Sequence, residues 1–180
     1  DVAELRAFAR DELGIKAMEP WDMAWVSEKL LQKRYAFSDQ EVKQYFPEDI
    51  VLRGLFRVAQ ALYQIDIVPA RAPVWHEDVR FFEIRDAAQA VVGHFYIDLY
   101  ARETKRGGAW MDDAITRRRK QNRIQTPVAL LNCNFSRPVG DKPALFTHDE
   151  VLTLFHEFGH GLHHLLTRVD DIGVSGINGV

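Results

Sequence analysis

The spacing of apolar residues changes twice along the chain, and this change constrains the fold more than any other feature. In the first third, apolar residues recur three or four positions apart, as at Leu52, Leu55 and Ala59, which is typical of one face of a helix. After Pro73 they alternate with polar residues, as in a half-buried strand, and helical spacing returns after Thr147. The sequence therefore predicts an α+β fold, mainly helical, with a small antiparallel or mixed sheet.

Four consecutive segments of one domain follow from this pattern. Residues 1–68 are predicted to be helical. Residues 74–135 are predicted to form the small sheet, with an inserted loop or helix between its strands. Residues 147–167 are predicted to form one further helix, and residues 168–180 the start of a glycine-rich loop. The strands are expected at Asp78–Arg85, Ala90–Tyr100 and Pro127–Phe135.

The apolar stripes of the helical segment are expected to face a core, since this is the usual fate of apolar side chains at helical spacing. One such stripe consists of Trp21, Trp25, Leu31 and Tyr35. Ser38 and Glu41 have the spacing of a capping box, in which each residue satisfies a backbone N–H of the other, and this predicts a helix start.

Polar residues within the predicted sheet leave two interpretations open. The face opposite the apolar one could be a half-exposed sheet surface or could line a cleft. It carries His94, Tyr96, Asp98 and Tyr100. The basic run Arg117–Lys120 is expected to be solvated surface, and Cys133, inside an apolar strand, is expected to be a buried small apolar residue.

Composition and charge exclude several classes of protein. The 180 residues carry 23 Lys and Arg against 26 Asp and Glu, a net charge of −3, which gives no electrostatic footprint for nucleic acid. A single cysteine excludes a disulfide framework. No apolar run approaches the roughly 18 residues of a membrane span. We therefore expect neither a nucleic-acid partner nor a membrane partner.

The last predicted helix contains the motif H-E-x-x-H at His156, Glu157 and His160. It begins with a second capping box, Thr147 with Glu150, so the motif lies in the middle of the helix. Two histidines four residues apart lie on the same helix face, where both imidazoles can reach one metal ion. Glu157 is rotated about 100° from His156, so its carboxylate can reach a metal-bound water without being a ligand.

This geometry predicts a division of labour. His156 and His160 bind one zinc ion as neutral imidazoles, and zinc lowers the pKa of its water toward about 7. Glu157 is the general base that takes the proton as the water attacks a peptide carbonyl, and it then delivers the proton to the leaving amine. Gly159 and Gly161, which each cost about 1 kcal/mol in a helix, suggest that something approaches the helix backbone closely.

A zinc site needs a third protein ligand, and the sequence offers no convincing one. His163 lies about 10 Å along the helix axis from His156, so His163 and its neighbour His164 are expected to support the ligands or to lie on the surface. Asp170 and Asp171 follow the helix and are expected to face solvent. The third ligand is therefore expected beyond Val180.

At this point four stretches resemble the thimet oligopeptidase family of zinc metallopeptidases, and most closely its bacterial branch. The resemblance covers nearly the whole chain and is strongest over T-H-D-E-V-L-T-L-F-H-E-F-G-H-G-L-H-H. That stretch is Thr147–His164, and the others are Tyr45–Tyr63, Trp75–Asp86 and Phe95–Asp113.

The resemblance implies a mostly helical enzyme with a small sheet beside the zinc helix, which cleaves short peptides inside a deep channel. It implies that His156 and His160 bind zinc, that Glu157 is the base, and that the third ligand is a glutamate on the next helix. Transition-state-stabilising tyrosines and a histidine are implied still further along. Since the chain opens at Asp1 and closes at Val180, we expect a partial catalytic domain that binds zinc weakly and has little activity alone.

The partners and location follow in the same way. We expect short peptide substrates, a monomer, and a cytoplasmic protein, with an organelle matrix as the alternative. Strand addition to a sheet edge, with Gly107–Trp110 as a candidate rim, would suit an extended peptide. Two other functions remain open: a zinc peptidase of another H-E-x-x-H family, and a non-catalytic zinc-binding module.

Overall fold

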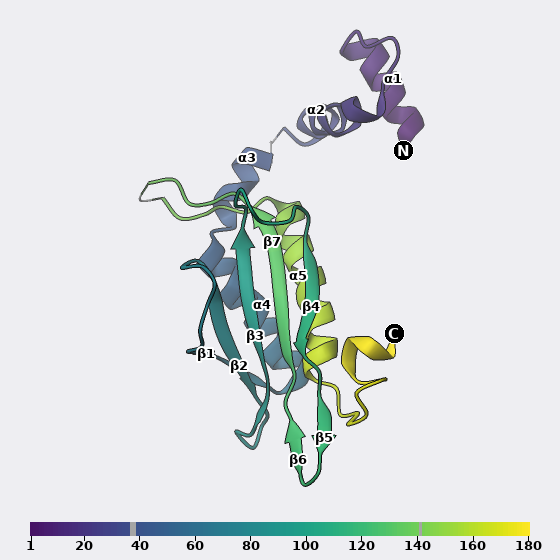
Figure 1. Ribbon diagram of the computed structural model, residues 1–180. Helices are drawn as coiled ribbons and strands as arrows, with labels where there is room; N and C mark the ends of the chain where they lie inside the picture. Colours follow the sequence, from purple (N-terminus) through teal and green to yellow (C-terminus); the bar gives the residue numbers. More distant parts are fainter. Residues whose placement is uncertain (37–38, 141) are drawn as a thin grey trace.

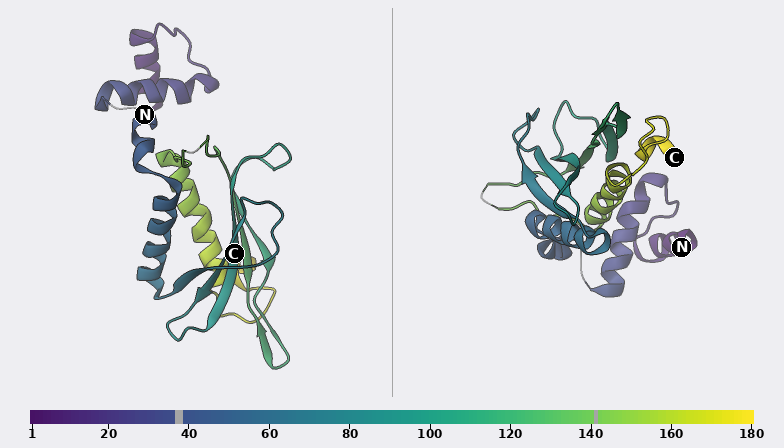
Figure 2. Two further views of the ribbon diagram at one scale, coloured as in Figure 1. Left: turned by 90° about the vertical axis from the view of Figure 1, so that its left-hand side faces the viewer. Right: turned by 90° about the horizontal axis from the view of Figure 1, so that it is seen from below.

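The computed structural model describes residues 1–36, 39–140 and 142–180. Its main body is a five-stranded sheet in the order β1-β2-β3-β7-β4. Two helices, α4 (Glu48–Tyr63) and α5 (His148–Leu165), cover one face of this sheet (Figures 1 and 2). The strands are β1 (Asp66–Ala70), β2 (Arg80–Arg85), β3 (Val91–Tyr100), β4 (Trp110–Ile115) and β7 (Val128–Phe135).

The sheet is mixed, as one of the two sequence-based alternatives predicted. β1, β2 and β3 form an antiparallel meander, whereas β7 pairs in parallel with β3 and antiparallel with β4. β7 therefore lies between two strands that follow one another along the chain. The α+β class is confirmed, and the three predicted strands correspond to β2, β3 and β7.

Four strands were not predicted from the sequence. β1 begins at Asp66, inside the segment expected to be helical, and contains Pro69, which demotes a strand prediction. The insertion between β3 and β7, expected as a loop or helix, begins with the irregular residues 101–109 and then holds β4 and the small hairpin of β5 (Arg118–Lys120) and β6 (Arg123–Gln125). β5 and β6 are only three residues long and mostly polar. Two adjacent aspartates interrupt any apolar alternation in β4, and its ladder partner β7 lies further along the chain.

The core lies between the sheet and the two helices. Phe56 of α4, Phe82 and Phe95 of the sheet, and Phe158 of α5 hold their ring centroids 5.0–6.1 Å apart. Cys133 on β7 is fully buried in the same layer, as expected. Aromatic rings at these separations add to the burial of apolar area, so the core fixes the position of α5 against the sheet.

The first two helices lie apart from this body (Figures 1 and 2). α1 (Val2–Glu12) and α2 (Met23–Tyr35), with the short helix Pro20–Asp22 before α2, pack against each other and bury Ala9 and Val26. The prediction that the apolar stripe of this segment faces a core is wrong, because no second apolar layer covers it in the described part of the chain. The exposed residues are Trp21, Trp25, Leu31 and Tyr35.

Short helical turns complete the described chain: α3 (Asp39–Val42) with the turn Lys43–Tyr45, and the turn Gly176–Gly179 after α5. Ser38 lies outside the described residues, so its role as a helix cap stays a prediction. No helix in the described ranges is both long enough and apolar enough to cross a membrane.

Candidate metal centre

The start of α5 fixes the register of the helix that carries the candidate site. The Thr147 hydroxyl accepts from the backbone N–H of Glu150 at 3.1 Å, and the Glu150 carboxylate accepts from the backbone N–H of Thr147 at 2.7 Å. This reciprocal pair confirms the predicted capping box. Acidic residues in the first turn also complement the helix dipole, so the local sequence is enough to define where α5 begins.

The two motif histidines converge on the exposed side of α5. The Nε2 atoms of His156 and His160 are 3.1 Å apart, and their ring centroids are 4.7 Å apart. In a tetrahedral zinc site with Zn–N bonds of about 2.0–2.1 Å, two ligand nitrogens lie about 3.3 Å apart. The pair is therefore close to the spacing of two corners of such a site, and its chemistry as neutral imidazole donors suits zinc.

Glu157, rotated about 100° from His156 around the helix axis, lies at the border between the exposed histidine face of α5 and the face that packs on the sheet. Its residue is 8% exposed, and within the described ranges its carboxylate has no hydrogen bond or ion pair. It lies near Cys133 of β7, where burial and, to a smaller extent, the charge of Glu157 together raise the pKa of the Cys133 thiol to about 12. A carboxylate without a protein partner is free to accept a proton from a water molecule or a substrate.

In the described part of the chain, no third ligand joins His156 and His160. Within residues 1–36, 39–140 and 142–180, no three His, Cys, Asp or Glu side chains lie close enough together to hold a metal ion. His163 is exposed, in agreement with the prediction. Asp171 is also exposed and accepts from the backbone N–H of Gly173 at 3.1 Å.

His164 is completely buried and serves a purpose that the sequence did not reveal. Its Nε2 lies 2.9 Å from the carbonyl oxygen of Ile115, at the end of β4, and must donate because a carbonyl only accepts. Its Nδ1 lies 3.5 Å from the backbone N–H of Ile177. Gly176 adopts φ +60°, and a Cβ there would lie 2.6 Å from Nδ1 of His164. His164 therefore joins α5 to β4 and to the glycine-rich loop.

Asp170 is the second anchor that sequence reasoning missed. Its carboxylate accepts from Nε of Arg117 at 2.9 Å and from Arg119 at 2.5 Å, and these cations lower its pKa against the opposing effect of burial. The expectation that Asp170 simply faces solvent is wrong, because the basic run provides its partners. Those partners lie about 50 residues earlier, so no local pattern could have identified the pair.

The edge of the sheet next to α5 is β4. This strand pairs with β7 on one side and, among the described residues, with no strand on the other. α5 contacts β4 and β7, so the free edge runs alongside the helix that carries the motif. The candidate rim Gly107–Trp110 leads directly into this edge.

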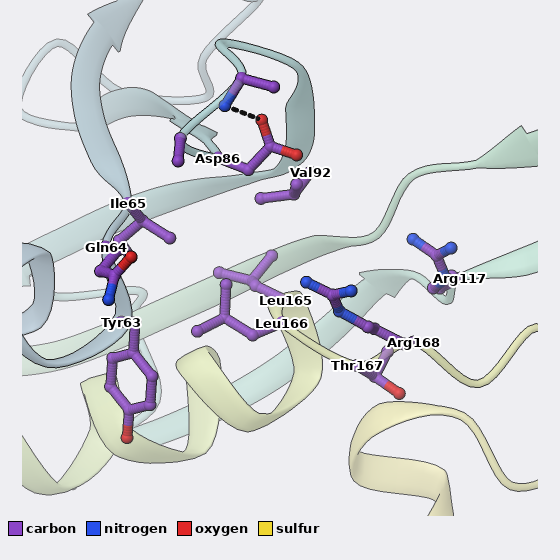
Figure 3. A pocket seen from close by; sticks show the side chains of 12 residues that line it. Tyr63, Gln64, Ile65, Asp86, Val92, Arg117, Leu165, Leu166, Thr167 and Arg168 are labelled. Carbon is purple, nitrogen blue, oxygen red and sulfur yellow. Dashed lines mark hydrogen bonds between the residues drawn. The ribbon is translucent and has the colours of Figure 1, made fainter.

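A cavity of about 710 Å³ lies away from the motif, at the end of α5 (Figure 3). Leu165, Leu166 and Arg168 line it, together with Ile65 after α4 and the turn near Asp86. None of His156, Glu157 and His160 lines it. The motif histidines are instead presented on an open helix surface.

Comparisons with known proteins add a family relationship to this geometry. A model described as peptidase family M3 matches residues 1–179. Oligopeptidase A of Escherichia coli (strain K12) is 56% identical over 182 residues, which cover 100% of this chain and 27% of that protein. Organellar oligopeptidase A, chloroplastic/mitochondrial, of Arabidopsis thaliana is 42% identical over 189 residues, covering 100% and 24%. A thimet-like oligopeptidase of Dictyostelium discoideum is 40% identical over 154 residues, covering 83% and 23%.

These matches confirm the resemblance to thimet oligopeptidases and to their bacterial branch. The chain spans about a quarter of the length of these curated relatives. The family relationship therefore holds along nearly the whole chain, which corresponds to only one segment of each longer relative.

Proposed function

The chain belongs to peptidase family M3, and we propose that it forms part of the catalytic domain of a zinc-dependent metallopeptidase that hydrolyses short oligopeptides. The observation that carries this proposal is the 3.1 Å approach of the Nε2 atoms of His156 and His160 on one face of α5. Glu157 is adjacent in sequence and has no hydrogen-bond or ion-pair partner among the described residues. Two imidazoles and a free carboxylate are the groups that metal-assisted hydrolysis requires.

His156 and His160 would hold the zinc ion, and a third ligand is expected beyond Val180. When bound, zinc would polarise the peptide carbonyl and lower the pKa of a water molecule toward about 7. The 3.1 Å approach of the two Nε2 atoms places both potential donor nitrogens beside one point in space, as binding of a single metal ion requires.

Glu157 is proposed as the proton carrier of the reaction. Its carboxylate takes a proton from the attacking water and passes it to the nitrogen of the leaving amine. No hydrogen bond or ion pair within the described chain competes for this carboxylate.

The free edge of β4 supports the choice of extended peptides as substrates. Backbone N–H and C=O groups on an unpaired strand edge can bind a peptide by strand addition, with little dependence on its side chains. A folded protein rarely offers a free extended segment, so an edge of this kind selects short or unstructured peptides. We propose a monomer in the cytoplasm, or in an organelle matrix, with no nucleic-acid or membrane partner.

Two alternatives are less well supported. A zinc peptidase of a different H-E-x-x-H family would match the motif, but the M3 model matches residues 1–179 and not the motif helix alone. A non-catalytic zinc-binding module would need the two histidines but not the base. The presence of Glu157 beside His156 favours a catalytic site.

The proposed base is tested in the full-length form, meaning this chain extended to the length of its relatives. Glu157→Gln should lower the turnover of a short quenched peptide by about a hundred- to ten-thousand-fold, because the amide cannot accept the proton. Zinc content, measured by elemental analysis, should stay at one ion per molecule. Glu77→Gln, at an exposed position away from the site, is the matched control and should leave both values unchanged.

Near-normal turnover of the Glu157→Gln variant would show that Glu157 is not the base. Full-length protein without zinc-dependent hydrolysis would contradict the proposed function itself. The 180 residues alone should bind zinc weakly and hydrolyse little peptide, because two imidazoles leave the coordination sphere incomplete. Robust, chelator-sensitive hydrolysis by this chain alone would contradict that part of the proposal.

A further inference from the structure

A buried group of charges lies at the end of β3, where the chain leaves toward β4. Asp98 is 1% exposed, and its side chain alternates with Ile97 and Leu99, which belong to the core beneath the helices. The side chain of Lys105 is 6% exposed and that of Arg102 is 15% exposed. Both cations belong to the segment that connects β3 to β4.

Lys105 binds an unusually dense set of oxygen atoms. Its Nζ lies 2.9 Å from Oδ1 of Asp98 and 2.8 Å, 3.0 Å and 2.5 Å from the carbonyl oxygens of Asp98, Tyr100 and Cys133. An ammonium group has three protons, so four acceptors use its full capacity. Since Asp98 and Tyr100 belong to β3 and Cys133 to β7, one side chain joins the two central strands to the segment before β4.

Both carboxylate oxygens of Asp98 also accept several hydrogen bonds. Arg102 donates to both of its carboxylate oxygens, at 2.8 Å and 2.6 Å, and Nε1 of Trp75 donates at 2.9 Å. Burial by itself raises the pKa of Asp98, but the hydrogen bonds from Arg102, Lys105 and Trp75 outweigh it and lower the pKa to about 2. Asp98 is therefore ionised across the ordinary pH range, whereas burial lowers the pKa of Lys105.

A buried ion pair contributes little to the free energy of folding, because the desolvation of both charges offsets much of their attraction. Such a pair is better suited to fixing one arrangement of the backbone. A second anchor acts on the same segment: Nδ2 of Asn134, on β7, donates to the carbonyl oxygens of Arg106 and Gly108 at 2.8 Å and 2.6 Å. The segment before β4 is thus held at Lys105 and again at 106–108.

The contacts of Lys105 and Asn134 affect both the free edge of β4, where a peptide would bind, and the part of β7 near Glu157. The rim Gly107–Trp110 follows the anchored segment and leads into β4, whose outer edge is free. The carbonyl of Cys133 is bound by Lys105, while the thiol of Cys133 lies near Glu157 on the other face of β7. The same lysine therefore fixes the start of the edge strand and the part of β7 that lies beneath the proposed base.

We propose that Asp98 and Lys105 are positioning residues that hold the free edge of β4 in a fixed alignment with Glu157, so that an extended peptide added to this edge places its cleaved bond at the motif. This inference rests on the proposed function. The two residues touch neither the substrate nor the metal ligands, and act through the backbone of β4 and β7.

The test uses the full-length, zinc-loaded form. Lys105→Met removes the ammonium while keeping an unbranched side chain, and Lys120→Met, at an exposed position of β5, is the matched control. For a peptide long enough to lie along β4, Lys105→Met should raise KM by about tenfold or more, with a smaller change in kcat. For a minimal peptide that spans only the cleaved bond, KM should stay unchanged, and so should zinc content.

Hydrogen exchange in the zinc-free protein provides a readout that does not depend on activity. Lys105→Met should speed the exchange of backbone N–H groups in β4 relative to those of β1, because the anchor at the start of β4 is lost. Unchanged exchange in β4 would overturn the positioning role even if the protein proved to be inactive. Equal losses of kcat for long and minimal peptides would also overturn it, since these indicate general damage.

A second variant covers the case in which Lys105→Met fails to fold. Asn134→Ala removes only the anchor at residues 106–108 and leaves the ion pair intact. It should raise KM for the long peptide and not for the minimal one, by a smaller factor than Lys105→Met. An unchanged KM ratio between the two peptides in this variant would overturn the proposal.

Discussion

The inner and outer faces of α5 each carry glycine and histidine, but for different physical reasons. Toward the sheet, a Cβ at Gly161 would lie 2.9 Å from Cδ2 of Leu131, and His164 is fully buried with a partner on β4. On the outer side, a Cβ at Gly159 would meet no atom within 4 Å in the described chain, and His163 is exposed. Contacts within the chain explain the inner glycine and histidine, whereas the outer face is better explained by the chemistry of His156 and His160.

The largest expected effect comes from a substitution on the outer face of α5, which should reduce activity and leave the stability of the fold unchanged. In the full-length form, His160→Ala should lower zinc content and reduce peptide turnover by at least about a thousandfold, because the metal's contribution to the transition state is lost. The free energy of unfolding of the zinc-free protein, measured with urea, should change by less than about 0.5 kcal/mol, as at other exposed positions. His163→Ala, one turn away and also exposed, is the matched control and should retain zinc and activity.

A large loss of stability in the zinc-free His160→Ala protein would contradict the proposed difference between the outer and inner faces of α5. It would show that His160 contributes to packing as the inner residues do.

The second largest effect comes from a substitution on the inner face of α5, which should reduce stability and leave zinc binding unchanged. His164→Ala should lower the free energy of unfolding by about 2–3 kcal/mol, because it removes the donor to the carbonyl of Ile115 and leaves a cavity in place of a fully buried side chain. Zinc content should be retained, because both ring nitrogens of His164 already face backbone groups, the carbonyl of Ile115 and the N–H of Ile177. Loss of zinc with unchanged stability would show that His164 belongs with the ligands.

The smallest effect comes from the two glycines and is the most direct comparison of the faces. Gly159→Ala should stabilise the full-length form by up to about 1 kcal/mol, if only helix propensity matters there. Gly161→Ala gains the same propensity but forces Leu131 to move, which costs about 1–3 kcal/mol, so it should be neutral or destabilising. The midpoints of urea unfolding would rank the pair, and the opposite ranking would contradict this account of the helix faces.

Local patterns explain what could be predicted from the sequence. The capping box and the spacing of His156 and His160 are contained within a few residues, so the extent of α5 and the convergence of the two imidazoles could be predicted. The chemistry of Glu157 remains a prediction, since the structure provides its position and not its reaction.

What could not be predicted depends on partners far away in the sequence. β4 is a short edge strand whose Asp112 and Asp113 obscure any apolar alternation, and its register is set by β7. Asp170 obtains its partners from β5 and the residue before it, and the bonds of Lys105 reach back to β3 and forward to β7. The exposure of Trp21 and Trp25 depends on the absence of a covering layer in the described chain, which helical spacing cannot reveal.

The placement of β7 between β3 and β4 has a consequence for how the protein folds during synthesis. β3 and β4 leave the ribosome before β7 does, and yet neither can form its hydrogen bonds on the shared side until residues 128–135 arrive. Until then, the backbone N–H and C=O groups on that side of β3 have no ladder partner. Completion of the sheet waits for the interior strand β7, and its nonlocal, parallel pairing with β3 is the step that we expect to limit the folding rate.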